Sequence, residues 1–164
     1  MITILHNIRS LHNVGSIFRT ADAAGIPKIY LTGITPAPVD RFGKVRPQLA
    51  KVSLGAEHYV KWDGSMRRPR AVSKLLEKLK KDGYKIFAIE QSKNSVPYYK
   101  IKISAHSKPI RAALVVGNEV RGLPATILKK ADKILEIPMH GRKESLNVAV
   151  AFGIVVFDLI HRPK

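Results

Sequence analysis

The chain has 164 residues, a length typical of one domain, and its 29 lysines and arginines outnumber 12 aspartates and glutamates to give a net charge of +17. It has no cysteine, which excludes disulfides, thiolate zinc sites, cysteine-ligated iron–sulfur clusters and cysteine nucleophiles. With 45% hydrophobic and 25% charged residues, the composition is that of a folded globular protein rather than a disordered one.

The hydrophobic pattern predicts strands that alternate with helices. Short apolar runs predict six strands, at 2–5, 28–31, 57–60, 84–89, 112–116 and 134–137. Helical spacing and turn residues predict four helices, at 13–24, 72–81, 124–130 and 146–160. The order β-α-β-β-α-β-β-α-β-α, with largely apolar strands, predicts an α/β fold in which helices cover a mainly parallel sheet. The sequence has no repeat, low-complexity tract or linker, so we expect a single domain over residues 1–164.

The N-terminus and the apolar runs carry no signal for secretion or membrane insertion. The first residues lack the basic and long apolar regions of a signal peptide. The longest apolar run, 148–157, is shorter than the roughly 20 residues that span a bilayer. We therefore expect a cytoplasmic protein with no membrane partner.

The positive charge predicts a polyanionic partner, and nucleic acid is favoured over an anionic membrane surface. The basic residues are spread over several segments, whereas a disordered basic arm would concentrate them at one terminus. Only segment 75–81 could form a basic amphipathic helix at a membrane, and packing against the core explains its pattern more simply. A basic surface that only keeps the protein soluble is the alternative.

Ligands of open α/β sheets bind beyond the carboxyl ends of the strands, so we expect a site among the residues that follow each strand. The sequence contains no G-x-G-x-x-G pattern. Gly117 and Gly122 have the spacing of a P-loop, but Leu123 and Pro124 follow where lysine and serine or threonine are required. These absences argue against NAD, FAD and P-loop nucleotide sites.

The first of three unusually polar segments is 13–21, N-V-G-S-I-F-R-T-A. Asn13 fits a helix N-cap, and Arg19 has the helical spacing to pair with Asp22. Gly15 costs about 0.5–1 kcal/mol relative to alanine inside a helix. This cost predicts that another chain or a ligand approaches closely there.

The other two polar segments each lie between a strand and a helix. In 117–124, two glycines bracket an asparagine and a glutamate, which fits a simple turn and also lets the backbone approach a flat ligand. In 137–151, Ser145 fits the N-cap of the last helix. Asn147 would then lie inside an apolar helix, where its amide needs a specific hydrogen-bond partner.

These three segments resemble the three motifs of the SpoU (TrmH) class of SPOUT methyltransferases, in the same order. The patterns are N-x-G-x-x-x-R-T-A at 13–21, G-N-E-x-R-G-L at 117–123 and I-P-M-x-G-x-x-x-S-L-N-V-A at 137–149. Segment 51–56, K-V-S-L-G-A, also resembles the family's K-x-S-x-G-A pattern. The resemblance covers nearly the whole chain, and three motifs in order make it specific.

The resemblance implies a Rossmann-like sheet with a deep trefoil knot in its C-terminal part, a homodimer, and S-adenosylmethionine as the cofactor, without a metal. The knot is implied by the family alone, because general topology rules disfavour knots. The cofactor is expected in the knotted crevice, held largely by backbone groups. The positions assigned to it are Ile89, Gly117, Asn118, Gly122, Ile137, Met139, Ser145 and Leu146.

The implied reaction is methyl transfer to a ribose 2′-oxygen of transfer or ribosomal RNA. The residues implied to be catalytic are Asn13, Arg19, Glu119, Ser145 and Asn147. Because a guanidinium has five donors, no acceptor and a pKa above about 12, we expect Arg19 to bind the adjacent phosphate and orient the hydroxyl. The family also implies a dimer interface through the first and last helices, so that one subunit completes the site of its partner.

Many relatives carry an N-terminal RNA-binding extension, whereas here the first motif begins at residue 13, so we expect the catalytic domain itself to bind RNA. The basic residues predicted to contact RNA are Arg41, Lys44, Arg46, Arg67, Arg68, Arg70, Arg142 and Lys143. Two alternatives stay open: a non-catalytic RNA-binding protein of the same fold, and a SPOUT enzyme that methylates a base nitrogen.

Overall fold

The computed structural model describes residues 1–68, 71–101 and 111–161. Its strands are β1 (Ile2–His6), β2 (Lys28–Thr32), β3 (Lys61–Asp63), β4 (Lys85–Ile89), β5 (Val96–Pro97), β6 (Ala112–Val116) and β7 (Lys133–Glu136). Its helices are α1 (Leu11–Ala23), α2 (Pro47–Ser53), α3 (Ala56–Tyr59), α4 (Ala71–Lys81), α5 (Ala125–Leu128) and α6 (Val148–His161), with a 3₁₀ turn, η1, at Tyr98–Lys100. The strands form one sheet in the order β3-β2-β1-β6-β4-β7-β5.

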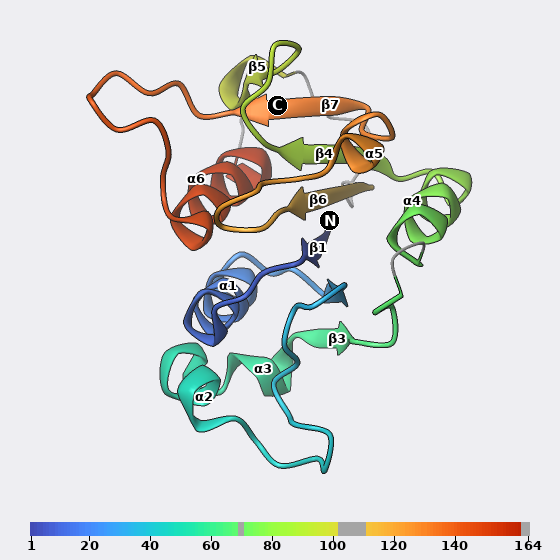
Figure 1. Ribbon diagram of the computed structural model, residues 1–164, viewed down its shortest axis with the longest axis vertical. Coiled ribbons are helices and arrows are strands. Elements are labelled where there is room, and N and C mark those ends of the chain that lie inside the picture. The colour runs from blue at the N-terminus through green and yellow to red at the C-terminus, as the bar shows by residue number, and fades with distance from the viewer. Residues whose placement is uncertain (69–70, 102–110, 162–164) are drawn as a thin grey trace.

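Every strand pairing in this sheet is parallel, which confirms the predicted α/β class. Helices α1, α2, α3 and α6 cover one face, and α4 and α5 cover the other (Figure 1). Phe18 and Phe152 are fully buried on the first face, and Leu76 and Ile127 on the second. Strand β6 lies near the centre of the sheet and is buried along its whole length, as its five apolar residues predict.

The predicted strand at 57–60 is wrong, because residues 57–59 lie in helix α3, Val60 is its C-cap, and the strand begins at Lys61. Leu54 and Gly55 adopt left-handed backbone conformations, which end α2 and start a new helical turn. The Ser53 hydroxyl donates to the Glu57 carboxylate at 2.5 Å and ties the two short helices together. Helix α2 itself is absent from the prediction, although Pro47 occupies its first position, where proline is favoured.

The predicted helix starts also need correction. Ser10, not Asn13, caps α1, and its hydroxyl accepts from the Asn13 backbone N–H at 3.2 Å. Helix α6 begins at Val148, so Ser145 is not its cap. The Asn147 side chain accepts instead from the Ala149 backbone N–H at 2.9 Å, so Asn147 lies at the start of the helix rather than inside it. Pro124 likewise precedes α5 instead of forming its first residue.

Helix α2, not a second chain or a ligand, makes the close approach to Gly15. A Cβ atom added to Gly15 would lie 2.7 Å from the Leu49 carbonyl oxygen and 3.2 Å from the Val52 Cβ. The absence of a side chain therefore lets α1 and α2 pack backbone to backbone. No helix in the described ranges is both long and apolar enough to cross a membrane.

We expect Gly15→Val to lower the free energy of unfolding by about 1–3 kcal/mol, because the new side chain must push α1 and α2 apart. Urea denaturation monitored by circular dichroism measures this change. Ala23→Val, at an exposed position of the same helix, is the control for the intrinsic helix preference of valine. Equal losses in the two variants would contradict the packing explanation.

Candidate functional site

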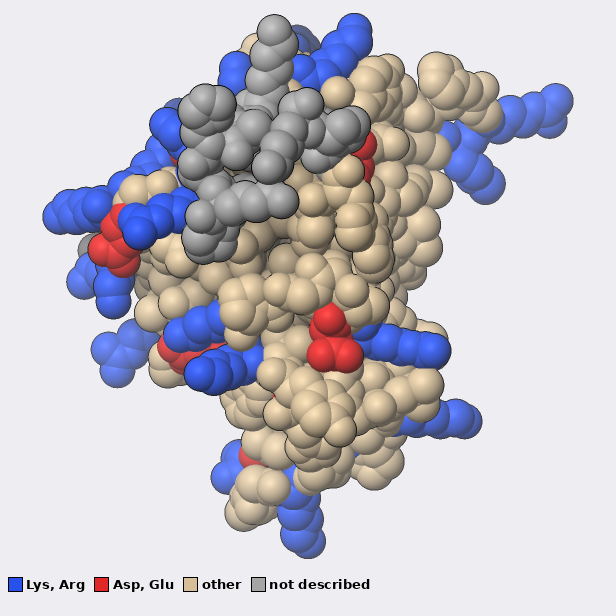
Figure 2. All heavy atoms as spheres, turned by 180° about the vertical axis from the view of Figure 1, so that it is seen from behind, with Lys and Arg blue, Asp and Glu red and all other residues tan. Residues whose placement is uncertain are grey.

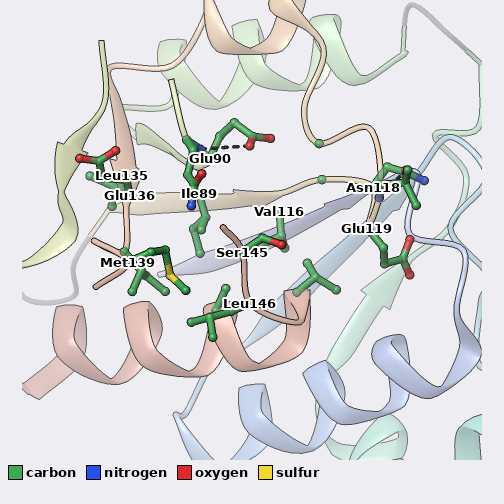
Figure 3. Close-up of a pocket in the computed structure, with 17 residues that line it drawn as sticks. Ile89, Glu90, Val116, Asn118, Glu119, Leu135, Glu136, Met139, Ser145 and Leu146 are labelled. Atoms are coloured by element: carbon green, nitrogen blue, oxygen red, sulfur yellow. Dashed lines mark hydrogen bonds between the residues drawn. The ribbon is translucent and has the colours of Figure 1, made fainter. Parts of the chain in front are cut away.

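A cavity opens where β4, β6 and β7 end, between the loop after β6 and the segment that leads from β7 into α6 (Figure 3). Its volume is about 840 Å³, including the open solvent at its mouth. All eight positions predicted for the cofactor line it: Ile89, Gly117, Asn118, Gly122, Ile137, Met139, Ser145 and Leu146. The parallel sheet thus brings together residues that lie more than fifty positions apart in the sequence.

The cavity wall combines apolar side chains with available backbone groups. Figure 3 shows Ile89, Met139 and Leu146 around one space, with Ser145 between them. Among the described residues, no hydrogen bond reaches the backbone N–H groups of Ile137, Met139 or Leu146. Apolar walls with a few available polar groups fit a flat heterocycle carrying polar substituents.

Three carboxylates also line the cavity, from Glu90, Glu119 and Glu136. Glu90 accepts from the Leu123 backbone N–H at 2.7 Å, and Glu136 accepts from the Ser95 hydroxyl at 2.6 Å. Acidic residues are scarce in a chain of net charge +17. Their concentration here favours a ligand with positive charge, which fits the sulfonium and ammonium groups of S-adenosylmethionine.

The sequence analysis missed Glu90, Gln91 and Glu136. Glu90 and Gln91 directly follow a buried strand, so the rule that sites lie at the carboxyl ends of strands could have identified them. The Gln91 side-chain amide donates to the Glu144 carbonyl at 2.6 Å, linking the loop after β4 to the segment after β7. Within the described ranges, no group of three or more histidine or acidic side chains is placed to hold a metal ion.

Gly117 and Gly122 shape the loop after β6. A Cβ on Gly117 would lie 2.7 Å from the carbonyl carbon of Gly122, because the loop folds back on itself. Gly122 has a left-handed φ of 62°, and a side chain there would strike the Glu90 carboxylate. The turn itself therefore requires both glycines, in addition to any ligand that approaches them.

A chain of hydrogen bonds joins three of the predicted catalytic residues. The Glu119 carboxylate accepts from the backbone N–H groups of Arg9 and Ser10 at 3.0 Å, and from the Asn13 amide at 3.1 Å. The Asn147 amide donates to the Asn13 side-chain oxygen at 3.0 Å, which supplies the specific partner predicted for it. The N-terminus of α1, the loop after β6 and the start of α6 are thereby held together.

The same contacts set the pKa of Glu119. Burial alone raises the pKa of this carboxyl, but hydrogen bonds from the backbone of Ser10, Arg9 and Glu119 itself, and from the Asn13 side chain, lower it below its ordinary value of 4.5. The charged form is therefore the one that the folded structure stabilises.

Arg19 stands apart from these residues. It is exposed on α1, does not line the cavity, and makes no ion pair with Asp22 among the described residues. Of the residues predicted to contact RNA, Arg41, Arg46 and Arg67 line a second cavity. Lys44, Arg68, Arg142 and Lys143 are exposed, and Arg70 lies outside the described residues. Figure 2 shows lysines and arginines projecting all around the outline of the molecule.

Comparison with known proteins identifies the family. The family model described as "SpoU rRNA Methylase family" matches residues 1–157. The chain belongs to the SpoU rRNA methylase family. It is 34% identical over 159 residues to a tRNA (guanosine(18)-2′-O)-methyltransferase of Aquifex aeolicus, covering 96% of this chain and 67% of the relative. Several staphylococcal relatives are matched over only 58% of their length.

Solved structures of the SpoU family agree with this assignment. The AdoMet-bound rRNA methyltransferase of Sinorhizobium meliloti superposes with a TM-score of 0.80 at 28% identity, covering 96% of this chain and 54% of that one. A structure described as giving insights into 2′-OH methylation of C/U34 on tRNA superposes with a TM-score of 0.73 at 28% identity, covering 95% of this chain and 91% of that one. The sheet and its helices are thus those of SpoU RNA methyltransferases.

We expect Glu119→Gln to lower the free energy of unfolding by about 1 kcal/mol near neutral pH, because the helix terminus loses a charged acceptor. The folded-state pKa is lowered, so the stabilisation is fully present above pH 4.5 and is lost as the pH falls through the folded pKa. The two proteins should therefore converge in stability in acid. Urea denaturation across this pH range tests the expectation, with Glu144→Gln as a charge-matched control. A difference that persists unchanged in acid would contradict it.

Proposed function

We propose that this chain transfers a methyl group from S-adenosylmethionine to the 2′-oxygen of a ribose in transfer RNA. The observation that carries the proposal is the convergence of all eight motif positions on one cavity in a chain of the SpoU family. The relatives named for tRNA guanosine 18 and for tRNA C/U34 support transfer RNA, with ribosomal RNA as the next substrate to test. The net charge of +17 supports a polyanionic substrate of either kind.

When bound, the cofactor supplies a methyl group on a positively charged sulfur. The backbone N–H groups of Ile137, Met139 and Leu146 would hold it, and the side chains of Ile89, Met139 and Leu146 would exclude water. The carboxylates of Glu90 and Glu136 favour its positive charge over a neutral ligand. Because methyl transfer requires oxygen, carbon and sulfur in line, positioning carries much of the rate.

Arg19 enters this proposal through a homodimer. Arg19 lies on the exposed side of α1, and α6 exposes apolar side chains at Val150 (50%) and Phe157 (37%). Pairing of α1 and α6 with the same helices of a second copy would cover the apolar face and carry Arg19 to the partner's cavity. There its guanidinium would bind the phosphate next to the target ribose and orient the hydroxyl, whose proton would pass to that phosphate oxygen.

The trefoil knot belongs to the same proposal. The segment after β7 returns to the cavity at Ser145 and Leu146, and the contact of Gln91 with Glu144 holds it against the loop after β4. This return supports a chain path in which the C-terminal segment passes behind an earlier loop. Action on transfer RNA would place the protein in the cytoplasm.

We expect label from tritiated S-adenosylmethionine to appear in one RNA size class, and Arg19→Ala to lose at least about a hundredfold in rate through misplacement of the hydroxyl. Arg111→Ala, which removes an equal charge at the opposite edge of the sheet, should keep its activity. Calorimetry should show unchanged cofactor binding in Arg19→Ala. After digestion of the RNA, label on a base rather than in alkali-resistant dinucleotides would favour the enzyme that methylates a base nitrogen. Absence of cofactor binding in the wild-type protein would favour the non-catalytic RNA-binding protein.

The Leu146→Trp variant fills the cofactor cavity with an indole ring from an exposed position. We expect an equal mixture of Arg19→Ala and Leu146→Trp subunits to recover up to about a quarter of wild-type activity. In the mixed dimer, one cavity remains open and receives Arg19 from the other subunit. Each variant alone should remain inactive. A mixture that forms heterodimers, as shown by differently tagged subunits, but gains no activity would contradict the exchange of Arg19 between subunits.

A further inference from the structure

A second cavity lies at the carboxyl ends of β2 and β3, away from the cofactor cavity. It has a volume of about 790 Å³ including its mouth, and three arginines line it: Arg41, Arg46 and Arg67. Trp62, the only tryptophan of the chain, also lines it. The cavity thus combines several guanidinium groups with one large aromatic ring.

Its outer wall is an ordered hairpin, residues 38–46, rather than a loose loop. The Asp40 carboxylate accepts from the backbone N–H groups of Phe42 and Lys44 at 2.8 and 3.0 Å, and Val39 and Val45 form an antiparallel bridge. The Phe42 ring at the tip is 72% exposed, with the Arg41 guanidinium 4.6 Å from its centre. The turn therefore holds an exposed aromatic ring and a cation at the rim of the cavity.

The charges inside the cavity are unbalanced. Asp40 is the only acidic residue in the lining, and one of its carboxylate oxygens is already occupied by the turn. The Nε atom of Arg46 is buried and has no hydrogen-bond partner among the described residues. Within the described ranges, none of the three arginines forms an ion pair with a carboxylate, so this lining favours an anionic ligand.

Gly64 keeps the floor of the cavity open beside the indole ring. A Cβ atom at Gly64 would lie 3.5 Å from the Trp62 ring and 3.6 Å from the Arg67 guanidinium. The Trp62 ring and the Arg67 guanidinium therefore both lie next to the space beside Gly64. Gly64 does not have a left-handed φ, so its backbone conformation does not require glycine.

We propose that this cavity binds an unpaired nucleotide of the RNA substrate, with its phosphate at Arg46 and Arg67 and its base against Trp62; this inference rests on the proposed RNA substrate. Guanidinium groups match phosphate geometry, and base–aromatic stacking requires a base that is not already stacked in a duplex. Because all strands are parallel, both cavities lie at the carboxyl edge of the sheet. Strand β3 is three positions from β6, at least about 14 Å, so this nucleotide is a different one from that being methylated.

The single tryptophan provides a direct test in the wild-type protein. Titration with a short oligouridylate should quench the emission of Trp62, whereas an RNA duplex that binds should leave it nearly unchanged. Arg46→Ala should weaken the quenching interaction about tenfold or more, and Arg111→Ala should weaken it much less. Gly64→Leu, which fills the cavity without changing the charge, should also abolish the quenching.

Oligouridylate that binds by fluorescence anisotropy without a change in Trp62 emission would overturn the proposal. So would an Arg46→Ala variant no weaker than Arg111→Ala, or a folded Gly64→Leu variant with normal quenching. The assay needs no cofactor, so it is independent of methyl transfer. Quenching without methylation would support the nucleotide subsite and reject the proposed function. Methylation without quenching would support the proposed function and reject the nucleotide subsite.

Discussion

The carboxylate of Glu119 is the contact on which the arrangement of the site depends. It accepts hydrogen bonds from the backbone N–H groups of Arg9 and Ser10, directly before α1, and from Asn13, whose side-chain oxygen in turn accepts from Asn147. Asn13 lies more than one hundred positions from both Glu119 and Asn147 in the sequence, and the hydrogen bonds join all three motifs. A negative charge at a helix N-terminus is favourable because the amides there have no intrahelical partners. One carboxylate thereby fixes the first helix relative to the cofactor cavity.

The hydrogen bonds of Glu119 also indicate what the polar residues of the three motifs do. In the single chain, Asn13, Glu119 and Asn147 form one chain of hydrogen bonds, and Glu119 also lines the cavity, so we expect these residues to act mainly by positioning. Ser145 lines the cavity, whereas Arg19 is exposed on α1 and does not line it. The five residues that the motifs group as catalytic therefore divide into a structural network, a cofactor-cavity residue and one exposed cation.

How much the sequence predicts depends on the range of the interactions involved. Strand β6 and helix α4 follow from local hydrophobic patterns, because burial on two faces or on one stripe leaves a clear signal. The eight positions proposed for the cofactor come from the motifs, and the structure brings them to one cavity. Helix α3 was predicted as a strand because four residues carry little periodicity, and the left-handed turn at Leu54 and Gly55 decides its form. The cap at Ser10 is a local contact with the Asn13 N–H, and the prediction missed it by starting the helix at Asn13. Strand β5 exists through its pairing with β7, which local patterns do not reveal.

The two cavities at the carboxyl edge of the sheet carry opposite charge. The cofactor cavity is lined by Glu90, Glu119 and Glu136, whereas the second cavity is lined by three arginines and one aspartate. A phosphate is repelled from the first cavity and attracted to the second, and the reverse holds for a positively charged sulfur. Parallel strands place both cavities at the same edge, and none of the described residues lines both. A strongly basic protein can in this way bind RNA over its surface and still keep a small acidic cavity free for a cationic cofactor.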